Sequence, residues 1–89
     1  MTIEFLDFYA DWCGPCRIME PTLQALEQEL GEKVKITKID VDNENEKAAA
    51  HGVMSIPTYI ILKDGNEVER FVGATSKEIL KTKIEAHLN

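Results

Sequence analysis

Apolar residues recur along the chain with two different periods, and the changes of period divide it into strands and helices. Ile3 to Tyr9 is almost wholly apolar, which is typical of a central strand covered on both faces. From about Cys13 to Leu30 the apolar residues return at alternating spacings of three and four, which predicts an amphipathic helix. Gly31 follows as a stop signal, and Pro21 is expected to bend the helix.

A second strand and a short helix follow. Apolar residues are mixed with lysines from Val34 to Val41, which predicts a strand. This strand ends in an acidic segment, in which Asp42 or Asn43 is expected to cap a short helix through Ala48 to Ala50. Gly52 lies just beyond that helix as a stop signal.

A β-hairpin and a final helix close the chain. The two strands of the hairpin are predicted at Thr58 to Leu62 and Glu67 to Val72, because Asp64-Gly65 is a strong turn signal between them. We expect a capping box at the start of the final helix, formed by Thr75, Ser76 and Glu78. The apolar side of this helix is expected to include Ile79, Leu80, Ile84 and Leu88.

The order of the predicted elements is strand, helix, strand, helix, strand, strand, helix. A right-handed βαβ unit followed by a hairpin and a closing helix gives an α/β fold, a four-stranded mixed sheet flanked by helices. We expect the strand from Ile3 to Tyr9 near the middle of the sheet. The 89 residues, 44% of them hydrophobic, can build the core of one domain spanning 1–89.

The charge balance narrows the possible partners. The chain carries 16 acidic and 10 basic residues, a formal net charge of -6, which disfavours binding to nucleic acid and to anionic membranes. Glu4 and Asp7 stand where a secretory signal would be basic and then apolar, and no segment approaches the roughly 18 uninterrupted apolar residues of a membrane span. We therefore expect a cytoplasmic protein with no nucleic-acid or membrane partner.

The only two cysteines, Cys13 and Cys16, lie in the motif Trp12-Cys13-Gly14-Pro15-Cys16 at the predicted junction of the first strand and the first helix. Two thiols two residues apart can close a short ring, and amide groups at a helix start favour the thiolate. Cysteines of cytoplasmic proteins are more often catalytic or redox-sensing than structural. The pair is therefore interpreted as a site of disulfide exchange.

Other roles for this pair are weaker. A zinc or iron-sulfur site needs about four protein ligands. The sequence has no second cysteine pair, and His51 and His87 are isolated, so we expect no metal within the chain. A dimer that shares a cluster through two such pairs stays open as an alternative. A purely structural disulfide across so short a loop would add only about 2 kcal/mol of stability.

Asp7 interrupts the apolar first strand. Burial raises the pKa of a carboxyl group because desolvation disfavours its charge, so Asp7 could exchange a proton with Cys16 near neutral pH. The alternative is a carboxylate held only by Lys38 or by water. Lys38 itself could moderate the charge of Asp7, or could be an exposed lysine at the sheet edge.

Several motifs together resemble the thioredoxin family over essentially the whole chain. They are Asp7-Phe8-Tyr9-Ala10-Asp11-Trp12-Cys13-Gly14-Pro15-Cys16-Arg17, Pro21, Lys38, Ile56-Pro57-Thr58 and Gly73-Ala74. The resemblance implies the thioredoxin fold without the strand and helix that usually come first in the family, as in a minimal or N-terminally shortened member. Loss of that strand leaves Val34 to Val41 at a sheet edge, where lysines discourage edge pairing.

By resemblance the protein is a protein-disulfide reductase, an electron carrier in cell redox homeostasis. Cys13, at the predicted helix start where the more exposed thiol is expected, is assigned as the nucleophile, and Cys16 as the resolving thiol. Gly14-Pro15 marks the reducing members of the family. The implied partners are a thioredoxin reductase and disulfide-containing protein substrates, and we expect a monomer without bound cofactor. A glutaredoxin-like or isomerase-like exchanger and a non-catalytic protein-binding module remain alternatives.

The resemblance also implies a surface for protein substrates. Pro57 would be a cis proline that faces the disulfide, shields it from metals and leaves the backbone of Ile56 free to pair with an extended substrate segment. The substrate-binding residues are then expected to be Trp12, Gly14, Pro15, Ile56, Gly73 and Ala74, with Pro57 in the same shallow apolar patch. The alternative for Trp12 is a place in the core. Met54 could border the patch, although its interpretation as an apolar filler is preferred.

Overall fold

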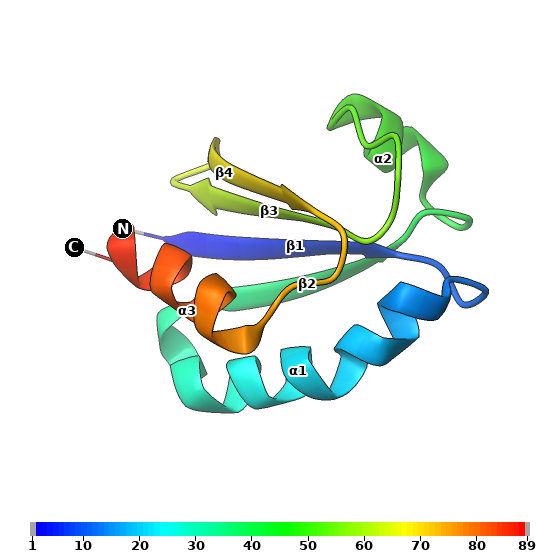
Figure 1. The fold of residues 1–89 in the computed structure, drawn as a ribbon. Coiled ribbons are helices and arrows are strands. Elements are labelled where there is room, and N and C mark those ends of the chain that lie inside the picture. The colour runs from blue at the N-terminus through cyan, green and yellow to red at the C-terminus, as the bar shows by residue number, and fades with distance from the viewer. Residues whose placement is uncertain (1, 89) are drawn as a thin grey trace.

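The computed structural model describes residues 2–88 and has the predicted mixed sheet with helices on both faces (Figure 1). Its elements are β1 (Ile3–Tyr9), α1 (Gly14–Leu30), the short 3₁₀ helix η1 (Gly31–Lys33), β2 (Lys35–Asp40), α2 (Asn45–Ala50), β3 (Thr58–Lys63), β4 (Asn66–Val72) and α3 (Lys77–Ala86). The predicted order of elements is confirmed. Within the described residues, no helix is both long enough and apolar enough to cross a membrane.

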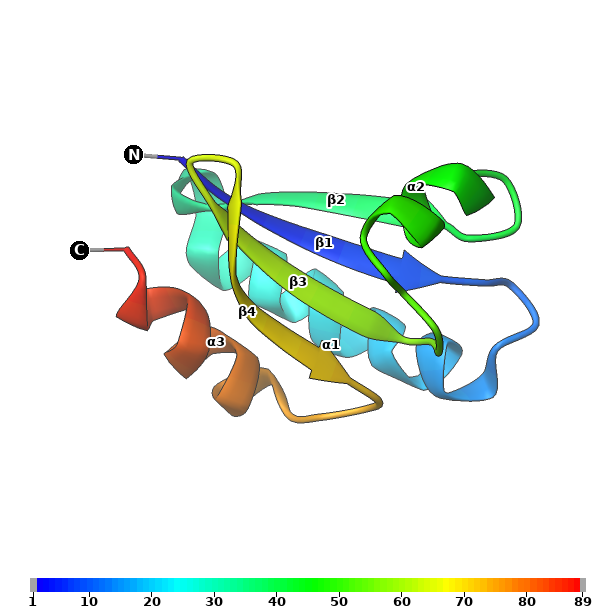
Figure 2. The ribbon, with the colours of Figure 1, turned by 90° about the horizontal axis from the view of Figure 1, so that it is seen from above.

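The strands of the sheet follow the order β2-β1-β3-β4. β1 pairs in parallel with β2 and antiparallel with β3, which in turn pairs antiparallel with β4. β1 therefore lies inside the sheet and β2 at its edge, as predicted. Figure 2 shows α2 on the near face of the sheet and α1 on the far face.

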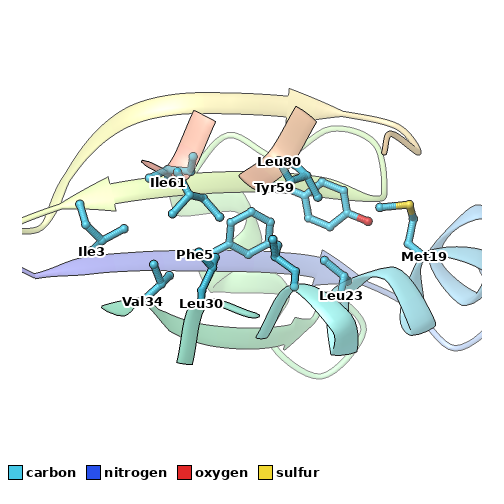
Figure 3. Close-up of a cluster of buried hydrophobic side chains, with 11 residues drawn as sticks. Ile3, Phe5, Met19, Leu23, Leu30, Val34, Tyr59, Ile61 and Leu80 are labelled. Carbon is cyan, nitrogen blue, oxygen red and sulfur yellow. The ribbon is translucent and has the colours of Figure 1, made fainter. Parts of the chain in front are cut away.

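The sheet separates two clusters of buried apolar side chains. The larger cluster joins β1 and β3 to α1 and α3 and includes Phe5, Leu26, Tyr59, Leu80 and Ile84 (Figure 3). The smaller cluster lies on the α2 side and consists of Leu6, Phe8, Ile39, Ala48 and Ile60. Because successive side chains of a strand point to opposite faces, Asp7 lies on the same face as Phe5, toward α1.

Tyr59 is the one residue of the larger cluster that brings a polar atom into it. Its ring is fully buried and stacks on Phe5, with 5.4 Å between ring centroids. Its hydroxyl group points toward Met19 (Figure 3) and, within residues 2–88, is the buried side-chain polar atom that has no hydrogen-bond partner. A buried hydroxyl without a partner lowers the free energy of unfolding.

The turn signals are confirmed, whereas the predicted cap of α2 is wrong. Gly31, Asp64 and Gly65 adopt positive φ values of 56°, 52° and 86°, as the helix stop and the two-residue hairpin turn require. α2 begins after Glu44 without a side-chain cap, because Asp42 is engaged elsewhere: its Oδ2 accepts a hydrogen bond from the Trp12 indole at 2.9 Å. Asn43 likewise does not cap α2; its side-chain amide donates to the carboxylate of Asp40.

The start of α3 also differs from the prediction. Ser76 alone caps this helix, since its Oγ accepts a hydrogen bond from the backbone amide of Ile79 at 3.1 Å. The predicted box with Thr75 is wrong, because Glu78 then falls in the second position of the helix instead of the third. Ile79 is half exposed, while Leu80 and Ile84 are fully buried, so the apolar side of α3 excludes Ile79.

Candidate active site

The two cysteines lie at the junction between β1 and α1. After β1 the chain turns through a backbone hydrogen bond from Cys13 to Ala10, and Cys13 becomes the N-cap residue of α1. Cys13 and Cys16 form a disulfide, with 5.2 Å between their Cα atoms. The backbone amide of Cys16 donates to Cys13 Sγ at 3.2 Å. The sulfur of Cys13 thus occupies the place of a normal helix cap.

This position favours a negative charge on Cys13 when the disulfide is reduced. Free amide groups and the helix dipole give the start of a helix a partial positive charge, which stabilises a thiolate there. The first turn of α1 contains no acidic residue that would oppose this effect. Cys16 lies one turn further along and has no comparable set of free amides.

The expected difference in exposure between the two cysteines is wrong. Cys13 is 4% exposed and Cys16 is 5% exposed, so both are buried in the disulfide form. Ala10 packs with them in a small cluster, and Tyr9, Val41 and Ile56 cover that cluster. The chemical difference between the two sulfurs therefore comes from their positions in the helix and not from their exposure.

Asp7 is buried, as predicted, and faces the helix that carries Cys16. It is 2% exposed, and desolvation by burial raises its pKa to about 6, whereas the charge of Lys38 opposes the rise and the charge of Glu20 adds to it. A cavity of about 160 Å³ lies beside Asp7 and is lined by residues of α1 and β2 that include Glu20, Gln24 and Lys38. Asp7 can therefore exchange protons with solvent in spite of its burial.

Lys38 combines the two roles that the sequence left open. It is exposed on the edge strand β2, yet it lies opposite Asp7 in the parallel ladder and lines the same cavity. Its Nζ lies 5.0 Å from the centre of the Tyr9 ring, which places the ammonium group over an aromatic face. The Tyr9 ring thus holds the positive charge close to Asp7.

Pro57 is buried and follows a cis peptide bond, as predicted. Its neighbour Ile56 packs against the cysteine cluster. The carbonyl of Pro57 accepts a hydrogen bond from the amide of Gly73 at 2.8 Å, which brings Gly73 and Ala74 to the same end of the molecule. Gly73 has a φ of 95°, a conformation that a residue with a side chain rarely adopts.

An apolar groove of about 380 Å³ opens beside the disulfide. It is lined by Trp12, Val41, Ala48, Val53, Met54, Ser55 and Ile56. Trp12 is 70% exposed, so its alternative as a core residue is wrong, and the hydrogen bond to Asp42 fixes its ring at the groove. Met54 is 96% exposed, so its interpretation as an apolar filler is also wrong.

The groove extends toward α2 and not toward Gly73 and Ala74, which the sequence had placed in the same patch. Sequence reasoning missed Val41, Ala48, Val53 and Ser55 as lining residues. One signal could have found Val53: it forms an apolar pair with Met54 in a segment that has no strand or helix pattern. Within residues 2–88, no group of three or more side chains suited to a metal ion comes together.

Comparisons with known proteins agree with this geometry. The family model described as Thioredoxin matches residues 2–86. The thioredoxin of Bacillus subtilis is 54% identical over 86 residues, which cover 97% of this chain and 83% of that protein. The thioredoxin of Listeria monocytogenes is 48% identical over 82 residues, which cover 92% of this chain and 80% of that protein.

Solved structures give the same result. A mutant thioredoxin from Halobacterium salinarum superposes with a TM-score of 0.90 at 39% identity, covering 98% of this chain and 75% of that one. The thioredoxin of Fasciola hepatica superposes with a TM-score of 0.89 at 43% identity, covering 97% of this chain and 81% of that one.

Proposed function

The chain belongs to the thioredoxin family and is a thiol-disulfide oxidoreductase, and from this premise we propose that Cys13 attacks protein disulfides and Cys16 completes their reduction. The observation that carries the assignment is the place of Cys13 as the N-cap of α1, where its sulfur already accepts the Cys16 amide. Among the two sulfurs, the one at the helix start forms the more stable thiolate.

The proposed reaction has two exchange steps. The Cys13 thiolate attacks one sulfur of the substrate disulfide, a mixed disulfide forms, and the first substrate thiolate leaves. Cys16 then attacks Cys13 Sγ, which closes the Cys13–Cys16 disulfide and releases the second substrate thiolate. Two electrons pass from the protein to the substrate.

Asp7 is proposed to accept the proton that Cys16 must lose before it attacks. A carboxyl group with a pKa of about 6 is mostly ionised at neutral pH and still basic enough to take up a proton. Lys38 supports this role, because its positive charge limits the rise of the Asp7 pKa. The cavity beside Asp7 allows the proton to leave to solvent afterwards.

Protein substrates are proposed to bind across the groove and the rim of the disulfide. The exposed ring of Trp12 and the partly buried Ile56 offer apolar contacts, and an extended substrate segment could pair with the backbone beside Pro57. Gly14 and Pro15 lie exposed next to the disulfide, and we propose that Gly73 and Ala74, beside Pro57, also contact the substrate. The partners of this single domain, a cytoplasmic monomer, are then disulfide-containing proteins and a reductase that restores the dithiol.

Trapping the intermediate tests the division of roles. In the presence of dithiothreitol the wild type should reduce insulin disulfides, whereas Cys13→Ser should not. Cys16→Ser should accumulate a mixed disulfide with the substrate, linked through Cys13, that mass spectrometry can identify. A mixed disulfide through Cys16 in the Cys13→Ser variant would reverse the assignment. If the biological function of the protein survived Cys13→Ser, the protein would act as a binding module and not as a reductase.

A further inference from the structure

Arg70 of β4 links the sheet to the end of α2. Its Nη2 donates to the backbone carbonyl of His51 at 2.5 Å, and its Nη1 donates to the carbonyl of Gly52 at 3.4 Å. His51 is the residue that ends α2. The last carbonyl groups of a helix have no partners within the helix, so a guanidinium group is a favourable donor there. One side chain thus joins two segments that lie far apart in the sequence.

Glu67 holds this guanidinium group in place. Its two carboxylate oxygens accept hydrogen bonds from Arg70 Nε at 2.9 Å and from Arg70 Nη2 at 2.8 Å. In a regular strand, residues three apart point to opposite faces and could not form this pair. β4 is irregular at this point. The neighbours Ile61 and Leu62 of β3 pair with Glu69 and Glu67, so Val68 is an extra residue in β4, which is a β-bulge.

This bulge puts both partners on the face of the sheet that α2 covers. Glu67 lies opposite Leu62, and Arg70 lies opposite Ile60. Ile60 belongs to the buried cluster beneath α2, and Leu62 packs against that cluster. The bulge is therefore what allows a paired glutamate and arginine to reach the end of α2.

The two carbonyl groups bound by Arg70 come directly before the wall of the groove. This wall is formed by residues 53–56, which are four of the seven residues that line the groove, and Pro57 follows directly. Val53 is tied to α2 by a backbone hydrogen bond to Ala48 at 2.9 Å, whereas Met54 and Ser55 are exposed and belong to no helix or strand. At the far end of the wall, the carbonyl of Ser55 accepts a hydrogen bond from Thr58 Oγ1 at 2.6 Å. The position of the near end therefore depends on the contacts of residues 51–53.

We propose that Arg70, oriented by Glu67, is a positioning residue that fixes segment 51–56 as one wall of the substrate groove. The inference rests on the proposed binding of protein substrates in this groove. A protein substrate that lies against Val53, Met54 and Ile56 depends on the position of the wall. A small aromatic disulfide that meets only the reactive sulfur does not.

The test compares two substrates with matched variants. Arg70→Met removes the guanidinium group and keeps the length of the side chain, and Arg70→Lys keeps the charge but cannot bind Glu67 and two carbonyl groups together. Lys77→Met is the control, because Lys77 pairs with Glu29 on the α1 and α3 side, away from the groove. KM and kcat are measured for insulin reduction, and the second-order rate constant for 5,5′-dithiobis(2-nitrobenzoate).

For insulin, we expect Arg70→Met to raise KM about fivefold at nearly unchanged kcat. A change of this size corresponds to about one net hydrogen bond, lost here within the protein, whose wall must then be ordered when the substrate binds. The KM of Arg70→Lys for insulin should lie between those of Arg70→Met and the wild type, and the KM of Lys77→Met should equal that of the wild type. The rate with the small disulfide should not change in any variant. The amides of Gly52 and Val53 donate to the carbonyls of Ala49 and Ala48, both at 2.9 Å. Their hydrogen exchange should be faster in Arg70→Met, while exchange in the rest of the folded protein should not change.

Two results would overturn the proposal. An unchanged KM for insulin in Arg70→Met would show that the wall does not depend on Arg70. Equal losses with insulin and with the small disulfide would show a general structural effect. If the wild type reduced neither substrate, both the proposed function and the positioning role would fail. If the wild type were fully active and Arg70→Met had the same KM for insulin, only the positioning role would fail. If Arg70→Met failed to fold, the same readings on Arg70→Lys would decide.

Discussion

Asp7→Asn replaces a buried carboxyl group with an amide of nearly the same size and removes its charge at every pH. Asp7 is 2% exposed, and burial raises its pKa from 3.8 to about 6. The folded state therefore binds the Asp7 proton more tightly than the unfolded state does, so ionisation of Asp7 destabilises the fold. Removal of this carboxyl group should make the protein more stable at neutral pH.

The size and the pH window of the effect follow from the two pKa values. Below pH 3.8 the carboxyl group is protonated in both states, and its ionisation costs nothing. The cost grows as the pH rises toward 6 and is constant above it. At about 1.36 kcal/mol per pKa unit, it reaches about 3 kcal/mol. Because the buried amide has a desolvation cost of its own, we expect a net gain of about 2 kcal/mol for Asp7→Asn at neutral pH.

Urea unfolding of the disulfide form between pH 4 and pH 8 measures this gain. The free energy of unfolding of Asp7→Asn, relative to the wild type, should rise through this range and level off above about pH 6. Asp11→Asn is the matched control, since Asp11 is an exposed aspartate beside Trp12 and the same chemical change there should shift stability by less than about 0.5 kcal/mol. Single-turnover kinetics should show normal attack by Cys13 and a slower resolving step in Asp7→Asn.

The refuting results are specific. A difference in stability that stays the same from pH 4 to pH 8 would show that ionisation of Asp7 is not coupled to folding. Lower stability of Asp7→Asn at pH 7, together with an unchanged resolving rate, would make Asp7 a structural acid and not a proton carrier.

Three further predictions concern the site and the core. Brief alkylation of the reduced protein at pH 7 should label Cys13 before Cys16, as mapped by mass spectrometry, because only Cys13 caps the helix; preferential labelling of Cys16 would exchange their roles. Tyr59→Phe should raise the free energy of unfolding by about 1 kcal/mol in urea, since it removes the unpaired hydroxyl, and a loss of stability would reveal a partner for that group. Met54→Asp should raise KM for insulin several-fold through desolvation of its charge in the groove, whereas an unchanged KM would place substrates elsewhere.

The sequence predicted the fold well because its signals were local. Alternating apolar spacings, the stop at Gly31 and the turn at Asp64-Gly65 each depend on neighbouring residues, and the structure confirms all of them. Asp7 could be predicted to be buried because the apolar residues around it in the sequence indicate a strand that is covered on both faces. The buried position then accounts for its raised pKa.

The features that the sequence did not predict depend on contacts between distant segments. Asp42 has the right chemistry for a helix cap, but its carboxylate instead accepts a hydrogen bond from the indole of Trp12, 30 residues earlier. The burial of Cys13 depends on Val41 and Ile56, which come from other parts of the chain. The bulge in β4 has no glycine or proline to mark it, so the pairing of Glu67 with Arg70 could not be read from an alternating strand pattern.

The antiparallel pairing of β1 with β3 sets the order in which the parts of the site can be assembled during synthesis. The cysteine pair directly follows β1, whereas the groove wall and Pro57 directly precede β3 and are placed only when β3 docks on β1. The hydrogen bond from Gly73 to Pro57 closes this end of the molecule later still. The two thiols of a nascent chain therefore emerge before the surface proposed to select their substrates, and that surface is complete only after β4 has been made.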